Sequence, residues 1–130
     1  MDWRECIQQR IVKDVKKDIN LISSMREIAT IKIRSADALP KELFIGKISL
    51  LYDALRELLE ATALERCFKI YNHECYSAFL KEILGLSDEA NMFDTLRKIR
   101  NGINYYGRMV GEEEATQILK DLKLLIAKFS

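Results

Sequence analysis

The sequence predicts an all-α fold, an antiparallel bundle of four to five helices with a long N-terminal helix. Apolar residues recur at steps of three and four along nearly the whole chain, and no segment alternates apolar and polar residues as a half-buried strand does. One proline and five glycines leave few chain breaks, so the helices must be long. The chain, residues 1–130, is large enough to bury its own core and is predicted to form a single domain.

The first helix is predicted from about Asp2 to Ser35. Its apolar stripe runs without an intervening glycine or proline, although the β-branched Ile31 and Ile33 weaken the pattern near the end. A helix of this length can outrun its own bundle, so we expect it to pack on a second copy in a homodimer. The stripe consists of Trp3, Ile7, Ile11, Val15, Ile19, Ile22, Met25 and Ala29.

The second helix is predicted to carry Pro40 in its first turn, where a missing N–H costs nothing. Its apolar residues run from Leu43 to Thr62, with a weaker continuation to Phe68. Asn72 is predicted to cap the third helix by accepting backbone N–H groups, and Gly85 is predicted to end it in a left-handed conformation.

The fourth helix is predicted to begin at Ser87, a hydroxyl cap that two acids follow at the positive end of the helix dipole. Gly107 is its expected end. The fifth helix starts after Gly111 and buries apolar residues as far as Phe129. Because the connections are short, consecutive helices are expected to pack antiparallel.

Bulk properties exclude several classes of protein. The 48% apolar and 32% charged content argues against disorder, and no apolar run approaches the roughly 18 residues that a membrane span needs. The first residues are already charged, unlike a secretory leader. Cys6, Cys67 and Cys75 match no zinc spacing, so we expect free thiols in a reducing compartment, the cytoplasm. We predict neither a metal nor a cofactor.

One segment, from Arg97 to Arg108, is distinctive. It contains four basic residues and no acid, together with two adjacent tyrosines and two asparagines. Such a mixture suits a phosphate-bearing ligand, which arginine holds bidentately and on whose bases tyrosine can stack. The predicted ligand-binding residues are Arg97, Arg100, Asn101, Asn104, Tyr105 and Arg108.

Structural alternatives stand beside this interpretation. Arg100 can instead pair with an acid of a neighbouring helix, such as Asp53 or Glu57, and adjacent tyrosines often bury their rings. Gly102, inside the helix, costs about 1 kcal/mol relative to alanine. Something is therefore expected to approach its backbone closely: a ligand, a neighbouring helix or a dimer partner.

His73 is the only histidine, and hence the only candidate for histidine-dependent catalysis. If helices three and four form a hairpin centred near residue 86, His73 lies level with Arg100. We therefore predict that His73 approaches Arg100, Asn101 or Asn104, as a general base or as an orienting group. The alternative is that His73 belongs, with its neighbour Asn72, to the cap of helix three.

The order of elements and the run from Arg100 to Tyr106 resemble the HEPN domains, over about residues 43 to 127. These helical bundles occur in toxin–antitoxin pairs, CRISPR effectors and partners of minimal nucleotidyltransferases. Active members join two copies of a motif, an arginine and a polar residue followed by histidine, into a metal-independent ribonuclease site. Arg100 and Asn101 match the start of the motif, but Tyr105 stands where the histidine would fall.

Three functional hypotheses follow. The first, which the missing histidine favours, is a non-catalytic, dimeric HEPN-like protein that binds nucleotide or RNA, or a partner nucleotidyltransferase, through the basic segment. The second is a ribonuclease toxin that uses Arg100 with His73 or Tyr105 as catalytic residues. The third is an assembly module without a ligand, which dimerises through its first helix.

Overall fold

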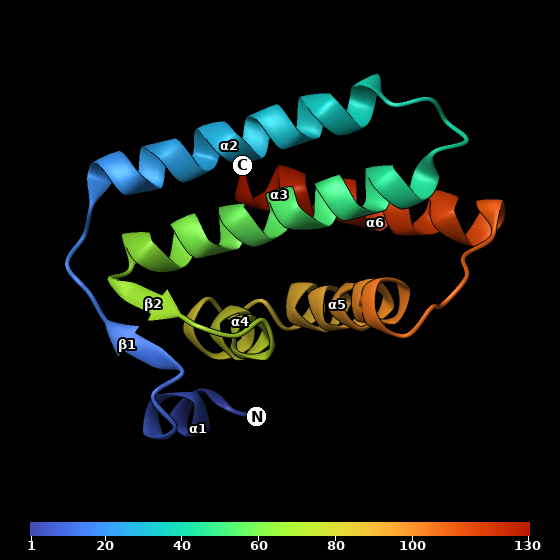
Figure 1. The fold of residues 1–130 in the computed structure, drawn as a ribbon. Coiled ribbons are helices and arrows are strands. Elements are labelled where there is room, and N and C mark those ends of the chain that lie inside the picture. The colour runs from blue at the N-terminus through green and yellow to red at the C-terminus, as the bar shows by residue number, and fades with distance from the viewer.

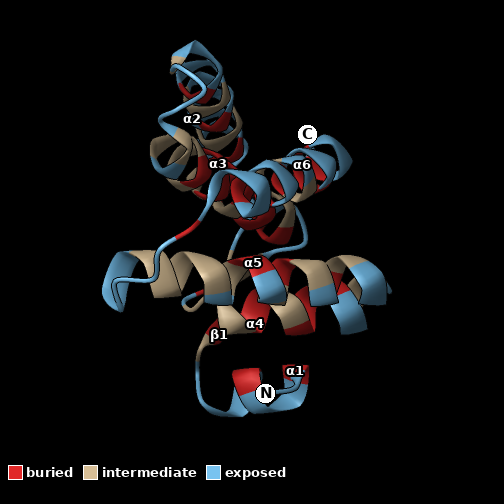
Figure 2. Ribbon diagram, turned by 90° about the vertical axis from the view of Figure 1, so that its right-hand side faces the viewer, coloured by how far each residue is buried: buried red, intermediate tan, exposed pale blue.

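Helix α3 (Phe44–Glu65) lies at the centre of the molecule, and three other long helices pack on it (Figure 1). The computed structural model describes residues 1–130. α2 (Ile19–Ala38) runs antiparallel to α3, as predicted, whereas α6 (Glu112–Phe129) lies along α3 in the same direction. α5 (Ser87–Tyr105) crosses below them and runs across the view of Figure 2, in which α3 and α6 are seen nearly end-on. The mainly helical class is confirmed, but the regular antiparallel order is not.

The long N-terminal helix predicted from Asp2 to Ser35 does not form. α1 (Trp3–Gln8) has only six residues, and Arg10 turns the chain with a φ of 59°. A helix start inside the predicted segment was overlooked: the side chain of Asp18 accepts the N–H of Leu21 and caps α2. The apolar spacing of three and four continues across both helices, so it does not reveal the break between them.

Two short strands replace part of the missing helix, and they correct the prediction that the chain contains no strand. β1 (Val12–Asp14) pairs antiparallel with β2 (Phe68–Ile70), with Val12 opposite Ile70 (Figure 1). The two strands are more than 50 positions apart in the chain. Because each strand has only three residues, neither is long enough to display an alternating pattern.

The third predicted helix forms in two parts. α4 (Glu74–Ala78) continues into a π-helical turn, η1 (Phe79–Ile83), and Gly85 ends it with a φ of 68°, as predicted. The Asn72 Oδ1 accepts the N–H of Cys75 at 2.9 Å, as expected of a residue that supports the start of α4, although His73 occupies the cap position itself. The apolar spacing of a single π-helical turn cannot be told from that of an α-helix, so the sequence did not predict η1.

Two other boundary predictions are wrong. Ser87 is the first residue of α5 and makes no capping hydrogen bond, because Leu86 occupies the cap position. Pro40 lies in the turn before α3, where its carbonyl accepts the N–H of Leu43. The remaining ends of α3, α5 and α6 agree with the sequence to within a few residues.

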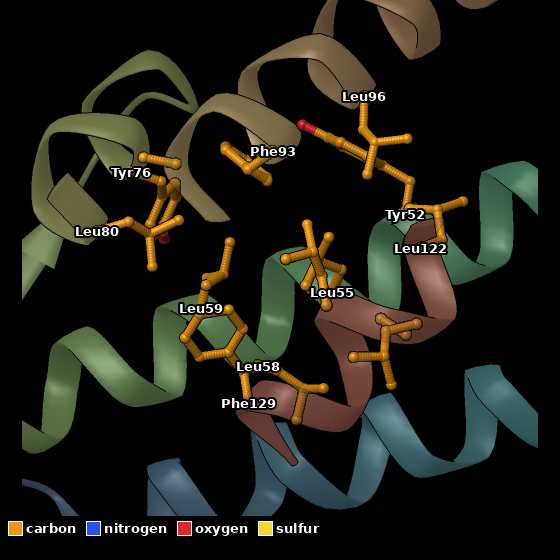
Figure 3. Close-up of a cluster of buried hydrophobic side chains, with 14 of the residues drawn as sticks. Tyr52, Leu55, Leu58, Leu59, Tyr76, Leu80, Phe93, Leu96, Leu122 and Phe129 are labelled. Carbon is orange, nitrogen blue, oxygen red and sulfur yellow. The ribbon is translucent and has the colours of Figure 1, made fainter. Parts of the chain in front are cut away.

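The core forms where α3 meets α4, α5 and α6. In Figure 3, Leu55 and Leu59 of α3 lie among side chains from all three neighbours. Tyr52 and Phe93 stack with their ring centroids 6.0 Å apart, which joins α3 to α5. Large side chains with less than 2% exposure include Tyr52, Tyr76, Phe79, Phe93, Leu55, Leu59 and Leu122.

α2 is the least buried of the long helices, as its colouring in Figure 2 shows. Its inner face contributes only Ile22, Ala29 and Ala36 to the buried set. On another face, Leu21, Ile28 and Ile31 are 44%, 44% and 54% exposed. None of the helices combines the length and the apolar character that crossing a bilayer requires.

Candidate functional site

Arg100 of α5 lies between two tyrosine rings. Its guanidinium carbon is 5.1 Å from the ring centroid of Tyr52 on α3 and 5.5 Å from that of Tyr105 at the end of α5. Cations at this distance are attracted to the ring face, more strongly when the site is partly removed from water. The Arg100 side chain is 18% exposed, so it is largely but not completely removed from water.

The polar contacts of Arg100 are all long. The nearest carboxylate oxygen, of Asp53, is 4.0 Å from its Nη2. Its Nη1 donates to the Asn101 side-chain oxygen and to the Tyr105 hydroxyl, each at 3.4 Å. Hydrogen bonds of this length are weak. The predicted structural pairing with Asp53 is therefore present only at the outer limit of an ion pair, and the pairing with Glu57 is absent.

His73 contacts the same tyrosine through its hydroxyl group. Its Nδ1 and the Tyr52 hydroxyl are joined by a hydrogen bond of 2.9 Å. No hydrogen bond connects His73 to Arg100, Asn101 or Asn104, but the positive charge of Arg100 is among those that lower the pKa of His73. Tyr52 contacts both His73 and Arg100, and we call Tyr52, His73, Arg100 and Tyr105 the Arg100 cluster.

Burial sets the protonation of this cluster. It raises the pKa of Tyr52 above its ordinary value, although Arg100 and Arg97 oppose the rise. Burial, with the positive charge of Arg56, Arg100 and Arg97, lowers the pKa of His73 to about 4. At neutral pH the hydrogen bond therefore joins a neutral imidazole to a neutral phenol, and His73 is a weak base.

The other cations of the basic segment have carboxylate partners. Arg97 donates to Asp94 at 2.7 Å, and Lys98 lies 3.1 Å from the same carboxyl group. Burial alone would raise the pKa of Asp94, but hydrogen bonds from Arg97 and Lys98 hold it below its ordinary value. Arg108 pairs with Glu114 of α6 at 2.7 Å. The segment itself contains basic residues and no acid, but acids outside the segment pair with these cations.

Gly102 has an explanation within the chain. A Cβ at this position would lie 2.9 Å from the Cδ of Arg108, closer than real Cβ contacts allow. Gly107, with a φ of 66°, turns the chain back so that the Arg108 N–H donates to the Gly102 carbonyl at 2.9 Å. The close approach comes from the segment that follows α5 in the same chain, and not from any of the three expected causes.

The end of α5 presents unburied aromatic and polar groups. Tyr105 and Tyr106 are 65% and 82% exposed, so their rings do not enter the core. Asn104 is also exposed, and Met109 follows with 88% exposure. Beside Arg100 the molecule therefore offers aromatic faces to solvent, the arrangement on which bases stack in proteins that bind single-stranded nucleic acid.

Sequence reasoning missed an ionic network on α3 beside the Arg100 cluster. Glu57 and Glu60 are 7% and 6% exposed, although charged side chains usually lie at the surface. Lys32 lies 2.8 Å from Glu57, while Arg56 and Lys69 both pair with Glu60. Only the four-residue spacing of Arg56 and Glu60 was visible locally, because the two lysines come from other elements.

The cysteines correct a further prediction. Cys6 of α1 and Cys75 of α4 form a disulfide, and only Cys67 is free and exposed. The expectation of three free thiols is wrong. Cys75 lies two residues after His73, but no three His, Cys, Asp or Glu side chains gather as metal ligands would.

No protein-family model, no curated protein and no solved structure matches this chain.

Proposed function

We propose that the Arg100 cluster and the exposed end of α5 bind the phosphate and base of a nucleotide or of single-stranded RNA, without cleaving it. One observation carries the proposal: Arg100 is held in place by two aromatic rings, yet it makes no short hydrogen bond to a carboxylate. A preformed guanidinium with donors to spare suits a phosphate group. Tyr105 and Tyr106 would stack on the neighbouring bases.

Arg97, Asn101, Asn104 and Arg108 are the outer contacts of this proposal. Arg97 and Arg108 already have carboxylate partners, so we expect them to contribute less than Arg100. His73 acts through Tyr52 in this scheme, as a positioning residue for the ring against which Arg100 lies. The HEPN-like assignment and a partner nucleotidyltransferase belong to the same proposal, as does a cytoplasmic location, where cellular reductants would act on the disulfide.

The test is binding of a fluorescent single-stranded RNA in EDTA, with RNA integrity followed on a gel. We expect Arg100→Ala to weaken binding about tenfold, as the loss of a charge-assisted contact does, and to flatten the salt dependence by about one phosphate contact. Arg34→Ala, which removes an exposed arginine of α2, is the matched control and leaves binding unchanged. Equal binding by Arg100→Ala and the wild type would contradict the proposal.

The same gel tests the ribonuclease alternative. The Tyr105 hydroxyl lies 3.4 Å from Nη1 of Arg100, so these two groups are able to act on one phosphate. Cleavage in EDTA that is lost in both Arg100→Ala and Tyr105→Phe would replace the binding proposal by this one. Cleavage by His73→Gln on the same gel tests whether His73 takes part in the reaction. Glutamine retains a hydrogen-bonding group for Tyr52 but cannot act as a base.

Homodimerisation through α2 is a second candidate, favoured by the exposed Leu21, Ile28 and Ile31. Apolar side chains that cluster on one face of a helix commonly mark an interface. Light scattering at increasing protein concentration would detect the dimer. We expect Ile28→Lys with Ile31→Lys to yield a monomer, and a wild type that is monomeric throughout would exclude this interface.

A further inference from the structure

A groove runs between α2 and α6, above the N-terminal half of α3. Both helices pack on α3, and in Figure 2 they diverge on either side of it. The space between them has a volume of about 510 Å³. It shares no residue with the Arg100 cluster or with the basic segment of α5.

The floor of the groove is apolar. Leu51 and Ala115 are buried there, and Phe44 and Leu119 are half-buried along its sides. Leu124 lies at the rim and is 56% exposed. A ligand that covers these side chains would remove apolar surface from water, with a gain of roughly 25 cal/mol for each Å².

The rim of the groove is positive. Four lysines line it against two acids, which leaves an excess of two positive charges, whereas the whole chain carries only +1. The remainder of the molecule is therefore slightly negative, so the groove is a local concentration of positive charge. The lysines are Lys41, Lys47, Lys120 and Lys123, and the acids are Asp37 and Glu112.

The ion pairs across the groove are exposed and replaceable. Lys123 lies 3.5 Å from Asp37, and Lys41 lies 3.7 Å from Glu112, with every partner more than half exposed. Pairs of this kind contribute little stability. Lys120 has no acidic partner at all, so its ammonium group is available to an incoming anion.

We propose that this groove binds a long-chain carboxylate, with the hydrocarbon chain on the apolar floor and the carboxylate at Lys120 and Lys123. The volume lies within the range of small-molecule sites, which are mostly apolar and carry few polar groups. The excess positive charge selects an acid head group over a neutral one.

Sodium oleate, titrated calorimetrically into the intact chain below its micelle-forming concentration, tests this site. We expect saturable binding of one oleate for each chain, and at least tenfold weaker binding of oleyl alcohol, which has the same hydrocarbon chain but no charge. Lys120→Glu reverses a charge close to the head group, and we expect it to weaken oleate binding about tenfold. Arg34→Glu is the control, because it reverses a charge on α2 outside the groove.

Ala127→Trp supplies a second, steric test. Ala127 is exposed and lines the groove, so a tryptophan there occupies the space of the hydrocarbon chain without disturbing the core. We expect this variant to lose oleate binding while its melting temperature is retained. Undiminished binding in either groove variant, equal binding of the alcohol, or no binding by the wild type would each overturn the proposal. A dimer that Ala127→Trp dissociates would assign the groove to a second copy instead.

Discussion

The Arg100 cluster and the lysine groove both collect positive charge, but they hold it differently. Around Arg100, the cations lie against aromatic rings or close to carboxylates, as Arg97 does against Asp94 at 2.7 Å. In the groove, Lys41 and Lys123 reach exposed acids at 3.5 to 3.7 Å, Lys47 donates to the Ala36 carbonyl, and Lys120 has no acidic partner. The first region is built from buried polar groups with partners, and the second from an apolar floor with a loose charged rim.

Because of this difference, we expect substitutions in the two regions to affect different properties, namely the stability of the fold and the binding of a ligand. Where buried groups depend on one another, removing one leaves its partner desolvated and unsatisfied. Where exposed charged groups surround an apolar floor, removing one of them changes the free energy of unfolding very little. Its loss is measured only as weaker binding of a ligand. We therefore expect substitutions of the buried Tyr52 to act mainly on the free energy of unfolding, and substitutions in the groove to act on affinity.

The largest expected effect is that of Tyr52→Ala. Tyr52 is 1% exposed, stacks on Phe93 and carries the guanidinium of Arg100 on its ring. Removing the ring should lower the free energy of unfolding by about 3–5 kcal/mol in urea titrations. Tyr52→Phe keeps the ring and loses only the hydrogen bond to His73, so it should cost about 1 kcal/mol. Equal losses in the two variants would mean that the hydroxyl, and not the ring, dominates.

The disulfide should have the next largest effect. It joins α1 to α4, close to His73, and closes a loop between residues 69 positions apart. Cys6→Ser should lower the free energy of unfolding by about 2–4 kcal/mol. Cys67→Ser, at the exposed free cysteine, is the control and should have no measurable effect. A reductant should destabilise the wild type and leave Cys6→Ser unchanged; a wild type insensitive to reductant would contradict this prediction.

A smaller effect is expected from the titration of His73. Its pKa is about 4 in the folded protein, against 6.5 for an ordinary histidine, so the unfolded chain takes up a proton first as the pH falls. The contribution of the neutral imidazole to stability is thus complete above pH 6.5 and is lost as the pH falls through about 4. Because the side chain is partly solvated, we expect on the order of 1 kcal/mol.

His73→Gln checks this titration, since glutamine retains a hydrogen-bonding group but carries no titratable proton. The difference in melting temperature between pH 7 and pH 4 should be larger for the wild type than for the variant. Carboxylates, Asp94 among them, titrate in both proteins and cancel in the comparison. The same pH dependence in both proteins would exclude His73 as the source.

The smallest effect on stability is expected in the groove. Lys120 is exposed and unpaired, so Lys120→Ala should change the free energy of unfolding by less than about 0.5 kcal/mol. Arg97→Ala, which removes a half-buried ion pair with Asp94, should cost more in the same urea titration. If Lys120→Ala destabilised the chain as much as Arg97→Ala, the contrast between the two regions would fail.

Local signals predicted three of the long helices well. The spans of α3, α5 and α6 follow from apolar spacing, and Gly85 and Gly107 adopt the left-handed conformation expected after a helix. The Asn72 side chain accepts a backbone N–H at the start of α4, as the sequence indicated. Each of these features depends on residues within about four positions, where the spacing of side chains and capping groups is read directly from the chain.

The candidate site was predicted only in part. Arg100, Asn101 and Tyr105 do lie together, because they occupy one end of a single helix. Tyr52, whose ring lies against Arg100, was not identified as a functional residue. In the sequence it appears as one apolar position among many on α3. His73 makes its hydrogen bond to the same tyrosine and not to the arginine, because level positions on two helices do not specify which side chains bond to each other.

Apolar spacing and glycine positions were sufficient to predict the mainly helical class, the spans of α3, α5 and α6 and the ends of two helices. The break between α1 and α2, the pairing of β1 with β2, the Cys6–Cys75 disulfide and the partner of each cation are visible only in the folded molecule. The physical reason is the range of the interactions. Helical hydrogen bonds and caps join near neighbours, whereas a strand pair, a disulfide, a buried ion pair and a groove all require segments that are distant in the chain to meet.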